Sequence, residues 1–291
     1  MSHSIAFVIA TKDRPQELRR LLRSIENQSC QPNQIIIVDG GDKITGDLMQ
    51  EFPLLSITYL RYLPPSAARQ RNWGIQYISA QTTLVGFFDD DIILEANSLA
   101  AMMDFWKDAQ EDIAGAGFNM TNTDGLSSSR LKSLALVNSL GLYSDTKGFI
   151  APSGFQALIG YAKETIFVRW LPTCAVVWRR KAFEEFKFDP WFSGYSYLED
   201  LDFSYRVGKK YRLAVVADAK YYHYLVPGGR ENSYQFGKKE VVNRVYFVMK
   251  NPELSLFKCY LALLIRMLIS LSLGIRRLKI TYFQRAGGNL V

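Results

Sequence analysis

Residues 84–94 read LVGFFDDDIIL, an apolar run that leads directly into three consecutive aspartates. The apolar part is typical of a buried strand, while adjacent carboxylates repel one another. Such a cluster is either a solvated turn or helix cap, or a site in which a divalent cation screens the charge. The cation site is favoured because the acids end a buried strand in a protein whose net charge is +7.

Strand-like and helix-like segments alternate around this stretch. Apolar, β-branched runs predict strands over residues 4–11, 34–39, 54–63 and 82–89, and helical spacing predicts helices over 14–28, 65–79 and 96–109. The alternation predicts an α/β fold with a doubly wound, mostly parallel sheet. Ligands bind beyond the carboxyl ends of the strands in such sheets, so the polar residues that follow these strands are expected to line one crevice.

The composition sets limits on the protein class. Hydrophobic residues make up 48% of the 291 residues, enough for a sizeable core. The three cysteines are widely spaced, which argues against a disulfide framework or a zinc site and favours a reducing compartment. The apolar run near the N-terminus is too short for a signal peptide, so we expect the protein in the cytoplasm. No recognisable nucleic-acid-binding module is present, and no nucleic-acid partner is expected.

The C-terminal region has a different character. Residues 251–291 hold six basic side chains against the single acid Glu253, and residues 254–275 are largely apolar apart from Lys258 and Arg266. A spanning helix would place Arg266 near the bilayer centre, at a cost of about 2.5–3.5 kcal/mol. We therefore favour a basic amphipathic appendage over 231–291 that lies in the plane of the inner face of the cell membrane. A spanning helix, a helix buried in the fold and a homodimer interface are the alternatives.

Five short motifs occur in one order along the chain: VIATKDRP, IIIVDGGD, ARQRNWGI, FFDDD and YLEDLDFSYRV. Together they resemble the family 2 glycosyltransferases over about residues 4–225. The resemblance implies a GT-A catalytic domain over 1–230, with a nucleotide-sugar-binding half (1–120) and an acceptor-binding half (121–230). It also implies inverting transfer from a UDP- or dTDP-sugar with Mn²⁺ or Mg²⁺ as cofactor.

The resemblance assigns donor-side roles to single residues. Asp39 would accept the N3–H of uracil or thymine, although it is also a candidate cap of the turn after its strand. Arg71 would lie against the diphosphate or base, with an ordinary surface ion pair as the alternative. The other donor-side assignments are Thr11 and Asp13 at the nucleotide, Asp89 at the ribose, Asp90 beside it, and Asp91 at the metal.

The motif YLEDLDFSYRV supplies a second acidic group. By position Asp200 would be the general base that deprotonates the acceptor hydroxyl, with Glu199 as a candidate acceptor contact. We expect Asp202 to pair with Arg206, four residues along the same helix. His223 is either a packed core residue or, as the resemblance implies, a further metal ligand.

Three further residues are candidate acceptor or phosphate contacts. Trp191 and Tyr195 precede the base and would either stack on a sugar or pack the pocket wall, and Arg230 would contact phosphate. The Q-x-x-R-W motif of polysaccharide-polymerising synthases is missing, which favours transfer of one sugar.

The expected function is transfer of one sugar to a hydroxyl of a lipid-linked saccharide or oligosaccharide acceptor, in bacterial cell-surface polysaccharide synthesis. A nucleotidyltransferase on a related α/β sheet is an alternative, but the segment ATKDRPQE holds no glycine for a phosphate loop. A non-catalytic sugar-nucleotide-binding scaffold is the second alternative, and the intact Asp89, Asp91 and Asp200 argue against it.

Overall fold

The computed structural model describes residues 3–43, 45–123, 135–224 and 232–290. The chain folds into two compact units, Met1–Thr123 with Gly160–Gly229, and Asp124–Ile159 with Arg230–Val291. The domain boundary expected at residue 230 stays a prediction. The described residues 135–159, which the resemblance places in the acceptor-binding half, pack with the C-terminal helices.

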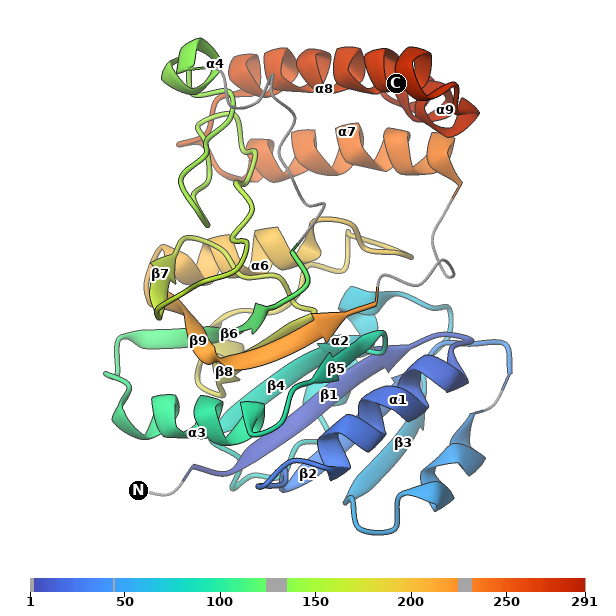
Figure 1. The fold of residues 1–291 in the computed structure, drawn as a ribbon, viewed down its shortest axis with the longest axis vertical. Helices are drawn as coiled ribbons and strands as arrows, with labels where there is room; N and C mark the ends of the chain where they lie inside the picture. Colours follow the sequence, from blue (N-terminus) through green and yellow to red (C-terminus); the bar gives the residue numbers. More distant parts are fainter. Residues whose placement is uncertain (1–2, 44, 124–134, 225–231, 291) are drawn as a thin grey trace. The chain divides into compact units, whose positions relative to one another are not determined.

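The first unit is built on a mixed sheet with the strand order β3-β2-β1-β4-β8-β6-β9-β5, and β7 pairs with β9 (Figure 1). Its strands are β1 (Ile5–Thr11), β2 (Gln34–Asp39), β3 (Ile57–Arg61), β4 (Leu84–Asp89), β5 (Ile92–Leu94), β6 (Ile113–Met120), β7 (Ile166–Val168), β8 (Ala175–Arg179) and β9 (Arg212–His223). Its helices are α1 (Pro15–Glu26), η1 (Gly46–Glu51), α2 (Ala67–Ile75), α3 (Ser98–Asp108), α5 (Ala182–Glu185) and α6 (Glu199–Gly208).

The expected α/β fold with helices on both faces of the sheet is confirmed. Phe7, Ile37 and Phe88 point to one face, where they share a core with residues of α1 and α3. The opposite face is covered by α2, whose Gly74 lies against Val8 and Val38, and by α6. A Cβ on Gly74 would come within 2.5 Å of Val8 Cγ1, so glycine is what allows α2 to lie this close to the sheet.

The sheet is less parallel than the sequence predicted. Strands β3, β2, β1 and β4 are parallel, but β8 runs antiparallel to both of its neighbours, β4 and β6. The short strand β5 and the edge strand β7 are also antiparallel to β9. The regular strand–helix alternation that parallel pairing requires ends after α3, and the later strands pair in both directions.

The second unit contains α4 (Ala135–Ser139), α7 (Ser233–Lys250), α8 (Leu256–Arg277) and α9 (Ile280–Gly288). Residues 141–157 are tied to these helices by polar contacts: Tyr143 donates to the Ala262 carbonyl at 2.6 Å, and Arg244 Nη1 donates to the Gly154 carbonyl at 2.5 Å. Arg244 is 1% exposed, so its bond holds the 141–157 segment against a buried part of α7. These contacts explain why this segment belongs to the second unit.

A buried ion-pair network joins the three C-terminal helices. Glu240 of α7 is 2% exposed and accepts hydrogen bonds from Arg266 of α8 at 2.9 Å and Arg285 of α9 at 2.8 Å. Gly237 and Gly288 have no side chains at the α7–α9 contact, where a Cβ on either would collide with the backbone of the other helix. Arg266, the residue that made a spanning helix unfavourable, is therefore turned toward α7.

We expect Glu240→Gln to lower the free energy of unfolding by about 3 kcal/mol, because it leaves two partly buried arginines without their counter-charge. Burial by itself would raise the pKa of Glu240, but Arg266 and Arg285 outweigh burial and lower the pKa from 4.5 to about 2. A carboxylate with a depressed pKa stabilises the fold above pH 4.5, and this contribution is lost as the pH falls toward 2.

Urea unfolding at pH 7 and at a series of lower pH values measures both effects. The exposed Glu253→Gln in the same unit is the matched control and should shift the midpoint little. If the two variants unfold at the same urea concentration, Glu240 does not hold these helices together.

Candidate functional site

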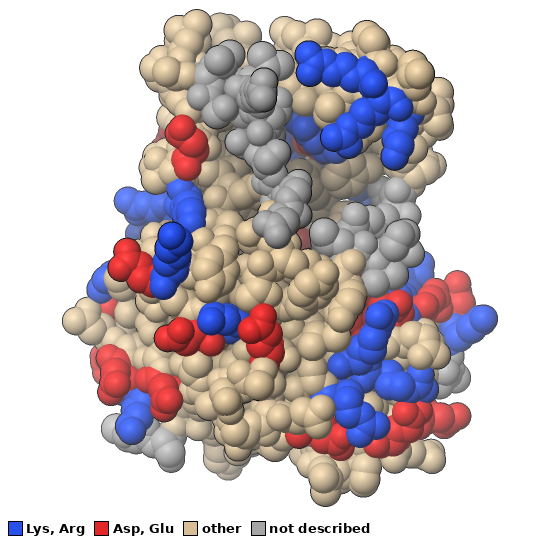
Figure 2. All heavy atoms as spheres, viewed as in Figure 1, with Lys and Arg blue, Asp and Glu red and all other residues tan. Residues whose placement is uncertain are grey.

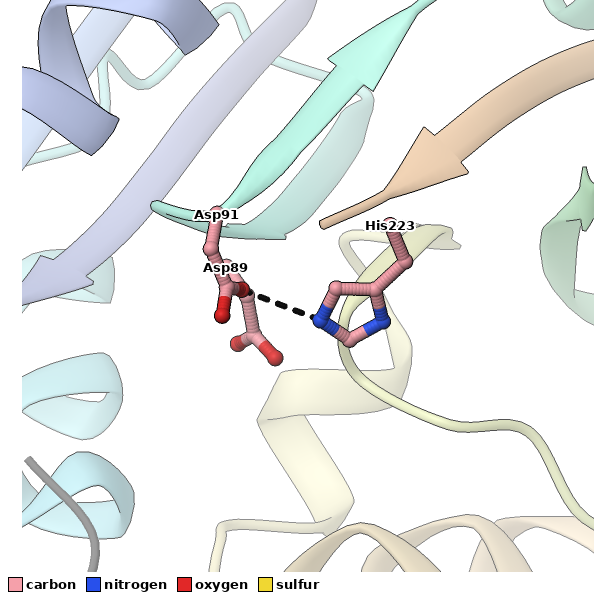
Figure 3. A group of neighbouring side chains, drawn as sticks. All are labelled: Asp89, Asp91 and His223. Carbon is pink, nitrogen blue, oxygen red and sulfur yellow. Dashed lines mark hydrogen bonds and ion pairs between the residues drawn. The ribbon is translucent and has the colours of Figure 1, made fainter. Parts of the chain in front are cut away.

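Three of the predicted residues form a compact ligand set at the carboxyl end of β4. One ligand atom each from Asp89, Asp91 and His223 lies within 4.8 Å of the others (Figure 3). Asp89 ends β4 and Asp91 lies in the turn before β5, while His223 ends β9. Two carboxylates and an imidazole in one cluster are a donor set that suits Mn²⁺ or a similar divalent cation.

The three-residue strand β5 explains how His223 reaches the aspartates. Ile92 of β5 pairs with His223 of β9, and the Tyr224 amide donates to the Asp91 carbonyl at 2.9 Å. This antiparallel pairing places the imidazole next to the turn that carries Asp91, with His223 Nε2 3.0 Å from Asp91 Oδ1. The resemblance assigns Asp89 to the ribose, and the structure places it among the candidate metal ligands as well.

His223 and Asp91 form an ion pair in this structure. Burial lowers the pKa of His223, but the hydrogen bond to Asp91 and the Cys174 thiol outweigh burial and raise it to about 10. Cys174 in turn lies 3.1 Å from the hydroxyl of the buried Tyr221. An imidazole binds a metal only in its neutral form, so a bound cation would replace the proton that His223 shares with Asp91.

Asp90 points away from this ligand set and toward β1. Its carboxylate accepts hydrogen bonds from the Thr11 hydroxyl at 2.7 Å and from Arg14 Nη1 at 3.0 Å. Burial raises the pKa of Asp90 to about 7, although Arg14 and Thr11 oppose the rise. Asp90 and Thr11 thus bind each other, and together they fix the turn that carries Asp91.

Arg14 is a site residue that the sequence reasoning missed. Its guanidinium contacts Asp90 Oδ1 at 3.0 Å and Asp91 Oδ2 at 3.2 Å, and so supplies positive charge to two of the three aspartates. The only signal in the sequence was a basic residue just after the first strand. That the Arg14 side chain points toward the aspartates cannot be inferred without knowing that β1 pairs with β4.

Arg71 connects the aspartate cluster with the acidic helix α6. Its guanidinium is nearly buried, binds Asp89 Oδ1 at 2.9 Å and forms a short hydrogen bond to Glu199. Burial raises the pKa of Glu199, Arg71 opposes this, and the charges of Asp200 and Asp89 add to the rise. In this structure Glu199 holds Arg71, and Asp200 lies beside that pair at the start of α6.

Asp200 is half-buried, and its Oδ1 accepts the Leu201 amide at 2.7 Å. The neighbouring Asp202 is fully buried and pairs with Arg206 at 2.9 Å, as the helical spacing predicted. The helix turns the consecutive acids in different directions. This leaves Asp200 as the acid of α6 that is both near the Arg71 guanidinium and partly exposed.

Asp39 is fully buried at the end of β2. It accepts the Gly41 amide at 2.7 Å, the Thr45 hydroxyl at 2.8 Å and the Tyr59 hydroxyl at 2.6 Å, and it pairs with Arg61 at 3.2 Å. Four donors use about all the acceptor positions of a carboxylate. A nucleobase N–H would therefore have to displace one of them, so the predicted base contact requires a local rearrangement around Asp39.

The remaining predicted site residues are Asp13, in the turn region after β1, two aromatic residues before α6, and Arg230. Asp13 has a left-handed backbone (φ 53°) and accepts the amides of Asp42 and Lys43, which orders the turn after β2. Trp191 and Tyr195 are 42% and 40% exposed in the segment before α6, which leaves their aromatic rings accessible to a ligand. Arg230 lies outside the described residues.

The comparisons with known proteins identify the family and the fold. The model of the family described as glycosyl transferase family 2 matches residues 6–186, and no curated protein matches the chain. Among solved structures, S. aureus TarS 1–349 in complex with UDP-GlcNAc has 16% identity and a TM-score of 0.55, with 84% of this chain and 66% of that chain covered. Against the longer TarS structure the chain spans 39% of the neighbour's length.

A second solved structure covers this chain completely. It is the mannosyltransferase PcManGT from Pyrobaculum calidifontis in complex with GDP-Man and Mn²⁺, with 12% identity, a TM-score of 0.59 and coverage of 100% of this chain and 87% of that chain. At such identities the likeness shows the fold alone. Because the family model covers more than half of the sequence, the chain belongs to glycosyl transferase family 2, and its sheet is like that of these solved GT-A structures.

Proposed function

We propose that this glycosyltransferase moves one sugar, with inversion, from a UDP- or dTDP-sugar to a hydroxyl group of a lipid-linked saccharide, in bacterial cell-surface polysaccharide synthesis. The observation that carries the proposal is the set Asp89, Asp91 and His223, joined through Arg71 to the acids of α6. One end of this arrangement suits a cation and a diphosphate, and the other offers a carboxylate for the acceptor.

The reaction needs one proton transfer and one displacement. Asp200 takes the proton of the acceptor hydroxyl, the oxygen forms a bond to the anomeric carbon from the face opposite the diphosphate, and the bond from that carbon to the diphosphate oxygen breaks. The electron pair leaves with the nucleoside diphosphate. Asp89, Asp91 and His223 would hold a divalent cation, Mn²⁺ or Mg²⁺, which supplies positive charge to the diphosphate when bound.

The other residues of the site position these groups. Arg14 and Thr11 hold Asp90 and so fix the turn before β5. Arg71, held by Glu199 and Asp89, keeps a positive charge between the metal ligands and the base. In the proposed donor complex a diphosphate oxygen replaces Asp89 as a partner of Arg71, because a guanidinium fork suits phosphate oxygens.

The proposal is tested by thermal shifts with a panel of nucleotide sugars in the presence of Mn²⁺. A ligand at 100 times its Kd stabilises the folded state by about 2.7 kcal/mol, which raises the Tm measurably. We expect UDP- or dTDP-sugars to raise the Tm and GDP- and ADP-sugars to leave it unchanged. A shift with GDP-sugars alone would contradict the assigned base, and no shift with any nucleotide sugar would contradict the donor class.

A further inference from the structure

The helix α8 exposes large apolar side chains to solvent, unlike an ordinary helix at the surface of a soluble protein. Six of its large apolar side chains are exposed along one side and are here called the apolar stripe: Phe257, Tyr260, Leu261, Leu264, Leu268 and Ile275. At about 100° per residue they fall within an arc of roughly 100°. The most exposed of them, Phe257 and Ile275, are 73% and 67% exposed and lie on the same line, five turns apart.

The opposite face of α8 packs inside the second unit and carries polar groups among its buried apolar residues. Arg266 pairs with the buried Glu240, and Ser270 is buried and donates to the Arg266 carbonyl. In a soluble helix the apolar face turns inward and the charged face outward. In α8 an ion pair lies on the inner face beside the buried Leu263 and Ile269, while the apolar stripe is exposed, so the exposed face suits an apolar surrounding.

Positive charge surrounds the end of the stripe. Arg276, Arg277 and Lys279 are all exposed, and residues 254–291 contain no aspartate or glutamate. Leu278 and Ile280, between and beside these cations, are 89% and 67% exposed. Figure 2 shows Lys and Arg side chains gathered on the part of the surface formed by the end of the C-terminal helices, at the upper right of the view.

We propose that the apolar stripe lies in the interface of an anionic lipid bilayer, with α8 parallel to the membrane plane and Arg276, Arg277 and Lys279 on the lipid phosphates. Apolar side chains flanked by basic ones are the pattern of interfacial helices. The helix is long and apolar enough to span a membrane, with 22 residues and a mean hydropathy of 1.8. Spanning, however, would require the Arg266–Glu240 pair to break and the inner face of α8 to leave α7 and α9.

A second copy of the chain is a less suitable occupant. In such a dimer the α8 surfaces of two copies would meet, and residues 254–291 offer no acidic side chain to pair with the cations. The three exposed cations near each apolar stripe would repel those of the other copy. An anionic surface matches both the apolar and the charged part. Membrane binding would bring the enzyme directly to a lipid-linked hydroxyl. This use of the membrane surface rests on the proposed function, in which the acceptor is lipid-linked.

The test is vesicle co-sedimentation of the full chain, without donor or acceptor. The probes are vesicles of phosphatidylcholine alone and vesicles that also contain phosphatidylglycerol. The stripe variant carries Leu264→Gln and Leu268→Gln, and the charge variant carries Arg276→Gln, Arg277→Gln and Lys279→Gln. Matched controls are Leu54→Gln, an exposed leucine of the first unit, and Lys107→Gln with Lys163→Gln and Lys209→Gln, which remove the same charge elsewhere.

We expect the wild type and both controls to bind the anionic vesicles and to be released by alkaline carbonate. The stripe variant should lose binding, and the charge variant should lose about tenfold or more of its affinity for anionic vesicles. Equal binding by all variants, or no binding by the wild type, would overturn the proposal. Retention after carbonate would show a spanning helix, and a dimer in light scattering that the stripe variant dissociates would show that a second copy covers the face.

The same variants separate this inference from the proposed function. UDP should shift the Tm of the stripe and charge variants as it does for the wild type, because these substitutions lie outside the nucleotide site. Vesicle binding without any nucleotide response would support the membrane surface and contradict the donor assignment. A Tm shift with UDP but no vesicle binding would support the donor assignment and contradict the membrane surface.

Discussion

Replacing Asp200 by asparagine is expected to reduce sugar transfer by about 10²–10⁴-fold while leaving UDP affinity nearly unchanged. Asparagine keeps the size and the hydrogen bond that Oδ1 accepts from the Leu201 amide, but it cannot take a proton from the acceptor. The loss should therefore appear in kcat at saturating donor and acceptor. Transfer from the UDP- or dTDP-sugar identified by thermal shift is the measurement.

Two further variants show whether such a loss belongs to the base or to the fold. Asp218→Asn removes an exposed acid from β9 and should transfer sugar at the rate of the wild type. Glu199→Gln releases Arg71 from its buried partner and should weaken UDP binding as well as transfer, since it acts through the position of the guanidinium. If Asp200→Asn turns over as fast as the wild type, another group removes the proton.

The second large effect is expected at Asp91. We expect Asp91→Asn to weaken Mn²⁺ binding by roughly 100-fold or more, because it removes the ligand that contacts His223 and lies deepest in the cluster. UDP binding should fall with it, since the cation supplies positive charge to the diphosphate. Calorimetry with Mn²⁺ alone and then with UDP separates the two losses.

The matched comparison is Asp90→Asn, which makes the same substitution at the adjacent position. Asp90 contacts Thr11 and Arg14 and lies outside the ligand set, so its variant should retain most of the Mn²⁺ affinity. In the wild type, EDTA should weaken UDP binding and Mn²⁺ should restore it. If EDTA leaves the affinity for UDP unchanged, the proposal that Asp89, Asp91 and His223 bind a metal ion is wrong.

Much of the first unit could be predicted from sequence because its signals are local. The apolar runs of β1, β2 and β4 and the periodic leucines of α1 are each complete within a dozen residues, and their alternation implies helices on both faces. The polar strand ends were recognisable for the same reason. The clustering of Asp89 and Asp91 follows from one strand end.

The parts that could not be predicted depend on long-range pairing. β5 has three residues, too few for a periodic signal, and yet its pairing with β9 brings His223 to Asp91. The antiparallel orientation of β8 and the orientation of the Arg14 side chain toward the aspartates likewise depend on which strands are neighbours in the sheet. In the C-terminal region the sequence shows Arg266 as a cation within an apolar run. That Arg266 faces α7 instead of water depends on Glu240, 26 residues earlier on another helix.

The shortness of β5 also has a consequence for engineering the enzyme. Side chains alternate between the faces of a strand, so one residue inserted between Asp91 and Ile92 would turn every later residue of β5 over or shift its pairing with β9. Either change would separate the imidazole from the carboxylates without altering any ligand. Chain length between positions 89 and 92 is thus as strict a requirement as ligand identity. Variants that test the proposed metal site should exchange side chains here and leave the spacing intact.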